Sequence, residues 1–149
     1  MWNENKSIEL SKICVVLFMA LQLICMIFAP ILVSRLIFMS APARTAGETL
    51  FLITIYIGSV PAGILLTYLY ILLHRISKGY VFIKENTTCL RYISWCCFAG
   101  AVICLVSVYY YLPWFAIAIA AAFVGLIVRV VKNVISKAVS LQDDSDLTI

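Results

Sequence analysis

The most regular feature of the sequence is a series of long apolar stretches separated by short polar segments. Three stretches without a charged residue span residues 13–34, 50–73 and 92–112, and a fourth begins at residue 113. A helix needs about 20 apolar residues to cross the hydrocarbon core of a bilayer. The fourth stretch reaches this length by continuing to residue 131, where Arg129 can extend its guanidinium to the headgroups. The pattern predicts an all-α polytopic membrane protein with one domain, residues 1–149, and four transmembrane helices.

Composition supports lipid as the solvent of these helices. The chain is 64% hydrophobic and only 12% charged, whereas about a quarter of the residues of a soluble domain are charged. The net charge of +4 comes from basic residues scattered singly between apolar blocks. Because they form no basic stripe, direct binding of nucleic acid is not expected, and the lipid bilayer is the expected partner.

The distribution of Lys and Arg predicts the orientation. With four spans, the N-terminal segment, the middle loop and the C-terminal end share one side of the membrane, and the other connections lie opposite. The first side holds nine basic residues: Lys6, Lys12, Arg75, Lys78, Lys84, Arg91, Arg129, Lys132 and Lys137. The opposite side holds only Arg35 and Arg44. Positive loops stay inside, so both termini are expected in the cytoplasm.

A cluster of aromatic residues marks the predicted outer interface. Tyr109, Tyr110, Tyr111 and Trp114 surround the junction of the third and fourth stretches, and such rings prefer the headgroup level. Pro113 fits the first position of a helix, where its missing N–H is not needed. The third and fourth helices are therefore expected to form an antiparallel pair joined by a short turn.

Small and polar residues inside the stretches predict how the helices pack. Small residues let helices approach closely in lipid, and they recur at helical spacing in the second, third and fourth stretches, with Gly125 among those of the fourth. The candidate packing residues are Gly58, Gly63, Cys96, Gly100 and Cys104. Packing within one chain is expected to account for them, and homodimerisation through the same faces is the alternative.

Two further residues stand out within the spans. Gln22 is expected to bond to a neighbouring helix, with Thr54, Thr67 or Ser107 as the partner. Pro61, like Pro30, removes a backbone hydrogen bond and should bend its helix. A static bend packed by a neighbouring helix is favoured over a broken helix lining a transport cavity.

The sequence lacks the residue patterns that are typical of enzymes and of ion-coupled transporters. No acidic, basic or histidine residue falls in the central membrane region, which argues against secondary active transport. No nucleophile–base pair, nucleotide loop or metal-ligand cluster occurs, and His74 is the single histidine. An enzyme is not expected, nor is a cofactor. The six cysteines are interpreted as reduced, apolar packing residues.

The middle loop and the C-terminal tail contain the candidate partner-binding residues. Gly79 is expected to end the second helix, Asn86 to cap the third, and Phe82 to be an exposed aromatic side chain at the membrane surface. Residues 132–149 are expected to form a basic amphipathic helix followed by an acidic tail. The tail candidates are Asp143, Asp144, Asp146, Leu147 and Ile149. A docking peptide is one interpretation of this tail, and intramolecular pairing of its acids with Arg75, Lys78 or Lys84 is the other.

These two segments also carry a family resemblance. Lys78-Gly79-x-x-Phe82, Asn86, Leu90-Arg91-x-Ile93 and the terminal Asp146-Leu147-Thr148-Ile149 resemble domain of unknown function 2975, a family of small bacterial four-helix membrane proteins. The family often has Asn where this chain has Ser145. The resemblance implies a multi-pass protein of the bacterial plasma membrane, often encoded beside a helix-turn-helix regulator. It implies no activity and no catalytic residues.

The function expected from these features is that of a non-enzymatic membrane regulator or interaction protein. It would present the middle loop and the tail to a cytoplasmic partner, such as a helix-turn-helix DNA-binding regulator. The alternative is a small transport or bacteriocin-immunity component that acts within the bilayer.

Overall fold

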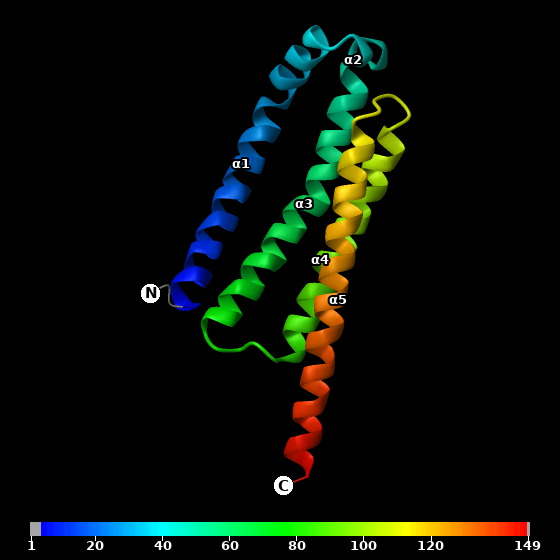
Figure 1. Ribbon diagram of the computed structural model, residues 1–149. Helices are drawn as coiled ribbons and strands as arrows, with labels where there is room; N and C mark the ends of the chain where they lie inside the picture. The colour runs from blue at the N-terminus through cyan, green and yellow to red at the C-terminus, as the bar shows by residue number, and fades with distance from the viewer. Residues whose placement is uncertain (1–3, 149) are drawn as a thin grey trace.

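The computed structural model describes residues 4–148, and within that range the chain forms helices joined by short connections (Figure 1). The helices are α1 (Glu4–Met39), α2 (Ala41–Ala46), α3 (Glu48–Ser77), α4 (Lys84–Ser107) and α5 (Trp114–Leu147). All except the short α2 are long and apolar enough to cross a membrane. The predicted all-α fold with four spans is therefore confirmed, and the chain is a multi-pass membrane protein.

The long helices extend beyond the apolar stretches that predicted them. Helix α1 begins at Glu4 and continues through Pro30 to Met39, and α3 continues through Pro61. In Figure 1 the course of α3 changes direction near the middle of the helix. A proline inside a helix removes one hydrogen bond and clashes with the preceding turn, which accounts for a bend without a break.

The third predicted span was too long at its C-terminal end. Helix α4 ends at Ser107, and residues 108–113 form a turn before α5. The rings of Tyr110 and Tyr111 pack edge-on against Phe51 of α3, with centroid distances of 5.1 and 5.2 Å. The tyrosines make these contacts from the turn after α4, although their sequence is apolar enough to continue the helix.

The connection between α1 and α3 contains the helix α2, which the hydrophobic pattern did not predict. Arg44 of α2 donates from Nη2 to the carbonyl oxygen of Phe38 at 2.7 Å, and from Nε to that of Ile37 at 3.3 Å. The guanidinium thus satisfies carbonyl groups that the end of α1 leaves without a helical partner. Gly47, at a φ of 79°, then allows the chain to turn into α3.

The long helices form an open row and not a closed four-helix bundle. Within the described residues, α1 packs against α3, α3 against α4, and α4 against α5, while the backbones of α1 and α5 stay apart (Figure 1). Each long helix therefore packs mainly on its neighbours in the chain. Helices α1 and α5 form the two edges of the row.

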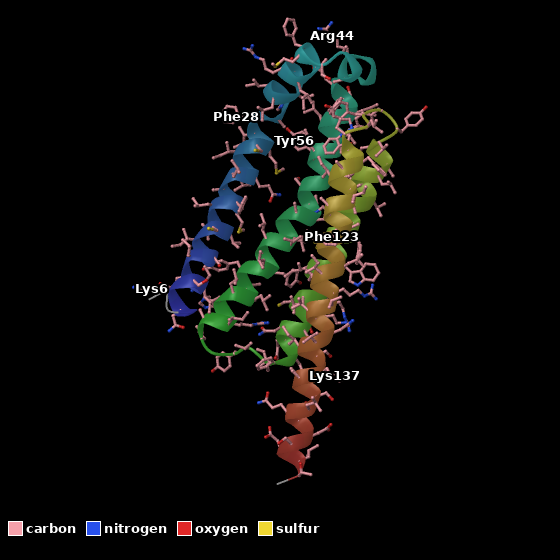
Figure 2. All side chains as sticks on the ribbon, viewed as in Figure 1. Lys6, Phe28, Arg44, Tyr56, Phe123 and Lys137 are labelled. Carbon is pink, nitrogen blue, oxygen red and sulfur yellow. The ribbon has the colours of Figure 1, made fainter. Side chains whose placement is uncertain are left out.

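The two ends of the row differ in what they contain. One end, here called the termini end, holds the start of α1, the α3–α4 loop and the last turns of α5 (Figure 1). The other, the turn end, holds α2 and the turn between α4 and α5. Lys6 and Lys137 lie toward the termini end and Arg44 lies at the turn end (Figure 2). The segments that hold nine basic residues and those that hold two therefore lie at opposite ends of the row.

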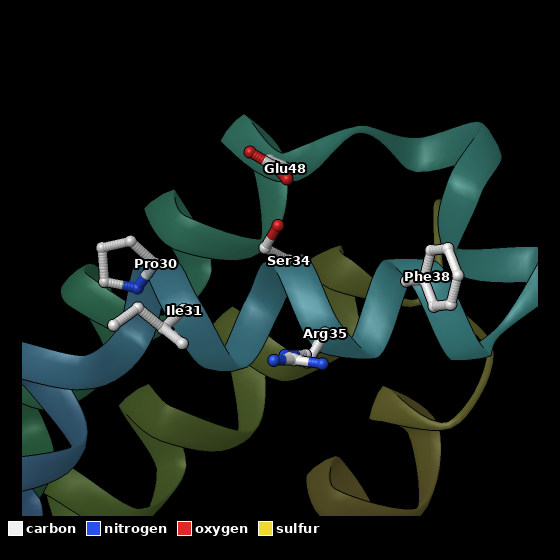
Figure 3. A pocket seen from close by; sticks show the side chains of 6 residues that line it. All are labelled: Pro30, Ile31, Ser34, Arg35, Phe38 and Glu48. Atoms are coloured by element: carbon white, nitrogen blue, oxygen red, sulfur yellow. The ribbon is translucent and has the colours of Figure 1, made fainter.

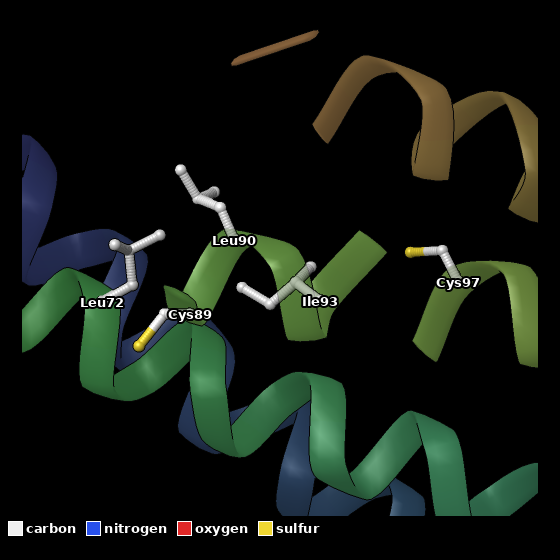
Figure 4. Packing of buried hydrophobic residues seen from close by; sticks show 5 residues of the cluster. All are labelled: Leu72, Cys89, Leu90, Ile93 and Cys97. Atoms are coloured by element: carbon white, nitrogen blue, oxygen red, sulfur yellow. The ribbon is translucent and has the colours of Figure 1, made fainter. Parts of the chain in front are cut away.

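Two small clusters of buried side chains hold the row together. In the half nearer the termini end, the buried members are Leu72 of α3 and four residues of α4, namely Cys89, Leu90, Ile93 and Cys97 (Figure 4). At the turn end, Phe51 packs with Val33 and Ala43 and with the aromatic residues of the α4–α5 turn. Most other large apolar side chains point outward, including Phe18, Phe28 and Phe123, as expected where lipid covers the surface.

Candidate functional site

The α3–α4 loop at the termini end is fixed by one buried amide. Asn86 is fully buried, and its Nδ2 donates to the carbonyl oxygens of Tyr80 at 2.7 Å and Val81 at 2.9 Å. Helix α4 begins at Lys84 with Ile83 at the N-cap position, so the prediction that Asn86 caps this helix was wrong. The Nδ2 group of this amide donates to the loop carbonyls, whereas a capping side chain uses its oxygen to accept from N–H groups of the helix.

The end of α3 agrees with the prediction that Gly79 would terminate this helix. Helix α3 ends at Ser77, and Gly79 has a φ of 87°, the left-handed conformation that terminates many helices. Phe82 is 52% exposed and Tyr80 is 58% exposed. The loop therefore presents two aromatic side chains beside the basic residues Lys78 and Lys84.

The C-terminal segment extends the fourth span as a single helix. Residues 132–147, expected as a continuing amphipathic helix and an acidic tail, all belong to α5, which projects past the other helices at the termini end (Figure 1). Asp143, Asp144, Asp146 and Leu147 are all exposed on this projection, which we call the α5 extension (residues 140–147). Ile149, the last candidate of the tail, lies outside the described residues.

One contact joins the α5 extension to the start of α4. Nζ of Lys84 lies 3.3 Å from Oδ2 of Asp143, so the acidic tail does pair with one of the three basic residues considered for it. Both side chains are more than half exposed, and such a pair contributes only about 0–1 kcal/mol. A groove of about 420 Å³ lies beside this pair, and Thr88, Ser140 and Asp144 are among the residues that line it.

Helix α1 is held to α3 by Gln22. Its Nε2 donates to the carbonyl oxygen of Ser59 at 2.7 Å, so the acceptor is a main-chain group and not one of the three hydroxyls expected from sequence. Gly63 lies beside this amide, and a Cβ at position 63 would be in ordinary van der Waals contact with Nε2, at 3.5 Å. Of the expected hydroxyls, that of Thr67 bonds to Gly63 of its own helix.

The remaining two hydroxyls form a network that sequence reasoning missed. The side-chain oxygens of Thr54 and Ser107 lie 2.9 Å apart, and the Tyr110 hydroxyl donates to Thr54 Oγ1 at 2.6 Å. Thr54 and Ser107 are buried between α3 and α4. The only signal in the sequence was the presence of polar side chains in apolar stretches, which does not identify partners.

The candidate small residues differ in what surrounds them. No atom of another helix lies within 4 Å of the Cβ position of Gly58 or Gly100, so packing within one chain does not account for these two, contrary to expectation. The close approach occurs at Gly125, where an added Cβ would lie 3.1 Å from Cys97 Cβ and 3.2 Å from Phe98 Cε1. Gly125 was noted in the sequence only as one of several small residues.

Pro61 and Cys96 line a groove of about 760 Å³ between α3 and α4, whose other lining residues are almost all apolar. The groove opens on the outer surface of the row. Cys104 is half-buried on the same helix, and all six cysteines are free thiols in the structure. Among residues 4–148, no three His, Cys, Asp or Glu side chains gather in a way that could hold a metal ion.

A further cavity, of about 540 Å³, lies at the turn end between α1 and the start of α3 (Figure 3). Arg35 and Glu48 both line it, with Pro30, Ile31, Ser34 and Phe38. Figure 3 shows the Arg35 and Glu48 side chains on separate sides of α1, and they form no ion pair in the described chain. The cavity therefore lacks a convergent set of polar groups.

Comparison with known proteins identifies one family. A family model described as "Protein of unknown function (DUF2975)" matches residues 28–149, which include the last third of α1 and all the later helices. No curated protein and no solved structure matches the chain.

Proposed function

We propose that this chain, which belongs to the DUF2975 family of proteins of unknown function, is a non-enzymatic membrane regulator that docks a cytoplasmic protein on its α5 extension. We place it in the bacterial plasma membrane with both termini in the cytoplasm, because the nine basic residues of the termini end far outnumber the two of the turn end. The partner that we propose is a helix-turn-helix DNA-binding regulator encoded by a neighbouring gene.

The observation that carries this proposal is the exposure of the α5 extension. Leu147 is 84% exposed and Leu141 is 62% exposed, next to the carboxylates of Asp144 and Asp146. Anionic lipid headgroups repel these acids, so the extension does not lie on the membrane surface and its leucines stay uncovered. A helix of this kind suits a protein groove with an apolar floor and basic rim.

The pair between Lys84 and Asp143 is compatible with docking. Because both side chains are exposed, the pair is weak enough for a partner to replace it without a large loss of free energy. The exposed rings of Tyr80 and Phe82 lie on the loop that precedes α4, and they offer a second contact area at the same end.

The test is binding of the purified neighbouring-gene regulator to the chain in lipid nanodiscs. The combined variant Asp144→Asn, Asp146→Asn, Leu147→Ala should weaken binding by at least about tenfold, since several contacts are lost together. Glu85→Gln is the matched control, because Glu85 is an exposed acid at the same end but lies on α4. Equal binding by wild type and the combined variant would show that the extension is not the docking element.

The second candidate is a transport or immunity component acting within the bilayer. The apolar groove beside Pro61 favours it, since this is the largest cavity described and it opens between two spans. On this alternative, substitutions in the α5 extension leave activity unchanged, while Ala99→Trp, which fills the groove, abolishes it.

A further inference from the structure

The cavity between α4 and α5 gathers basic side chains from two helices. It has a volume of about 320 Å³ and is lined by Arg91, Ser94, Trp95, Phe98, Arg129 and Lys132. Three of these six side chains are cations and none is an acid. Among residues 4–148 the one ion pair joins Lys84 to Asp143, so none of the three cations forms an ion pair with a carboxylate.

The antiparallel packing of α4 and α5 explains why Arg91 and Arg129 line the same cavity. The hydroxyl of Ser94 donates to the carbonyl oxygen of Gly125 at 3.0 Å, which sets α4 and α5 in register. Arg91 precedes Ser94 by one helical turn, and Arg129 follows Gly125 by one turn. Because the helices run in opposite directions, both guanidinium groups are displaced toward the termini end, at the same level.

That level is the boundary between apolar and polar sequence. Arg91 directly precedes the charge-free stretch 92–112, and Arg129 directly follows the charge-free stretch 113–128. Trp95 is 64% exposed beside them, and indole rings favour the headgroup level of a bilayer. The cavity therefore lies where the phosphates of lipid headgroups are found.

The lining of the cavity matches one class of ligand. Guanidinium groups bind phosphate through paired N–H donors, and the half-buried Lys132 adds a point charge. Phe98 follows Ser94 by one helical turn in α4, toward the interior of the bilayer, and gives the cavity an apolar inner wall. We propose that this cavity binds an anionic phospholipid, with its phosphodiester between Arg91, Arg129 and Lys132 and its glyceride portion against Phe98.

The neighbouring groove limits where the headgroup lies. Arg91 also lines the groove beside the Lys84–Asp143 pair, where the carboxylates of Asp143 and Asp144 are found. These carboxylates repel an anion, so the phosphodiester stays in the inner cavity. This site is separate from the proposed docking of a protein on the α5 extension, and either can be true without the other.

The test uses the full chain purified in detergent, with phosphatidylglycerol and phosphatidylcholine of identical acyl chains as the probes. Native mass spectrometry measures the lipid retained by each protein. The wild type should retain phosphatidylglycerol in preference to phosphatidylcholine. Arg91→Gln with Arg129→Gln should reduce this preference at least about tenfold, because two charge-assisted contacts are lost.

The matched control is Lys78→Gln with Lys137→Gln, which removes the same charge from exposed positions at the termini end that do not line the cavity. It should keep the preference of the wild type. Arg129→Lys keeps the charge but loses the planar fork, so an intermediate preference is expected, and this variant serves if the double variant does not fold.

Three results would overturn the proposal. The wild type could retain both lipids equally, or the control could lose the preference as fully as the cavity variant, which would mean that overall charge is responsible. Displacement of phosphatidylglycerol by excess inorganic phosphate would show that the cavity takes free phosphate and does not recognise a lipid.

Discussion

Ser94 of α4 and Gly125 of α5 are joined by a hydrogen bond between spans, with the serine hydroxyl donating to the glycine carbonyl at 3.0 Å. Both residues are buried. A Cβ at position 125 would lie 3.1 Å from Cys97 Cβ and 3.2 Å from Phe98 Cε1, so these side chains would have to move by a few tenths of an ångström, and glycine leaves the close approach of the two helices undisturbed. In lipid, where apolar surfaces are already solvated, such close packing is a main source of helix association.

Gly125→Ala should therefore destabilise the chain, and Gly100→Ala should not. The added methyl at 125 would lie 3.1 Å from Cys97 Cβ, whereas nothing of another helix lies within 4 Å at position 100. Overpacking costs about 1–3 kcal/mol. Thermal unfolding in one detergent, followed by circular dichroism, compares the two variants. Equal unfolding midpoints for the two variants would mean that the α4–α5 contact accommodates the added methyl group without loss of stability.

The hydroxyl network at the turn end predicts a second pair of variants. Thr54→Val removes the side-chain partner of both Ser107 and Tyr110, while Thr67→Val removes only a bond within α3. Hydrogen bonds between membrane helices are worth about 0.6 kcal/mol on average, so Thr54→Val should lose about 1 kcal/mol. Denaturation in mixed micelles measures the difference. If Thr67→Val is the more damaging of the two, the network does not stabilise the row.

Asn86 should be needed for the shape of the α3–α4 loop. Asn86→Asp keeps the size of the side chain but cannot donate to the carbonyls of Tyr80 and Val81, and buried unsatisfied groups cost about 1–3 kcal/mol each. Limited proteolysis should cut the variant faster within residues 78–83. Thr88→Ala, at an exposed position of α4, is the control. An unchanged cleavage rate in Asn86→Asp would assign the loop conformation to Gly79 alone.

The orientation can be checked by thiol labelling of intact cells. Ala41→Cys at the turn end should react with a reagent that does not cross membranes, and Tyr80→Cys at the termini end should react only after lysis. Both positions are exposed, so accessibility differs only through the membrane. The opposite pattern would place the termini outside the cell and remove the basis for a cytoplasmic partner.

The number of spans could be predicted because length and hydrophobicity alone decide whether a helix can cross a bilayer. The ends of the helices could not. Asn86 has the composition of a helix cap but bonds backward to the loop, and Tyr110 follows an apolar run but packs on a residue 59 positions earlier, Phe51. Both outcomes depend on partners that are distant in the chain, and a hydrophobic pattern does not specify them.

The candidate site residues also divide into those that the sequence could predict and those that it could not. Exposure of Phe82 and of the acidic tail could be inferred because both lie in polar segments outside the spans. The meeting of Arg91 with Arg129 could not, since it depends on the register of α4 against α5, which is set by Ser94 and Gly125. Small residues at helical spacing indicated several packing faces, and only the three-dimensional structure separates Gly125 from Gly58 and Gly100.

The open row of helices has a consequence for how the protein is made. Because each long helix packs mainly on the one before and the one after it in the chain, a helix can pack on its predecessor as soon as it has been synthesised. The α1–α3 hairpin can enter the bilayer and pack before α4 leaves the ribosome, and α4 and α5 can then add in order. Low sequence separation between contacts favours rapid assembly, so stepwise co-translational insertion suits this chain better than the late closure that a ring of four helices would require.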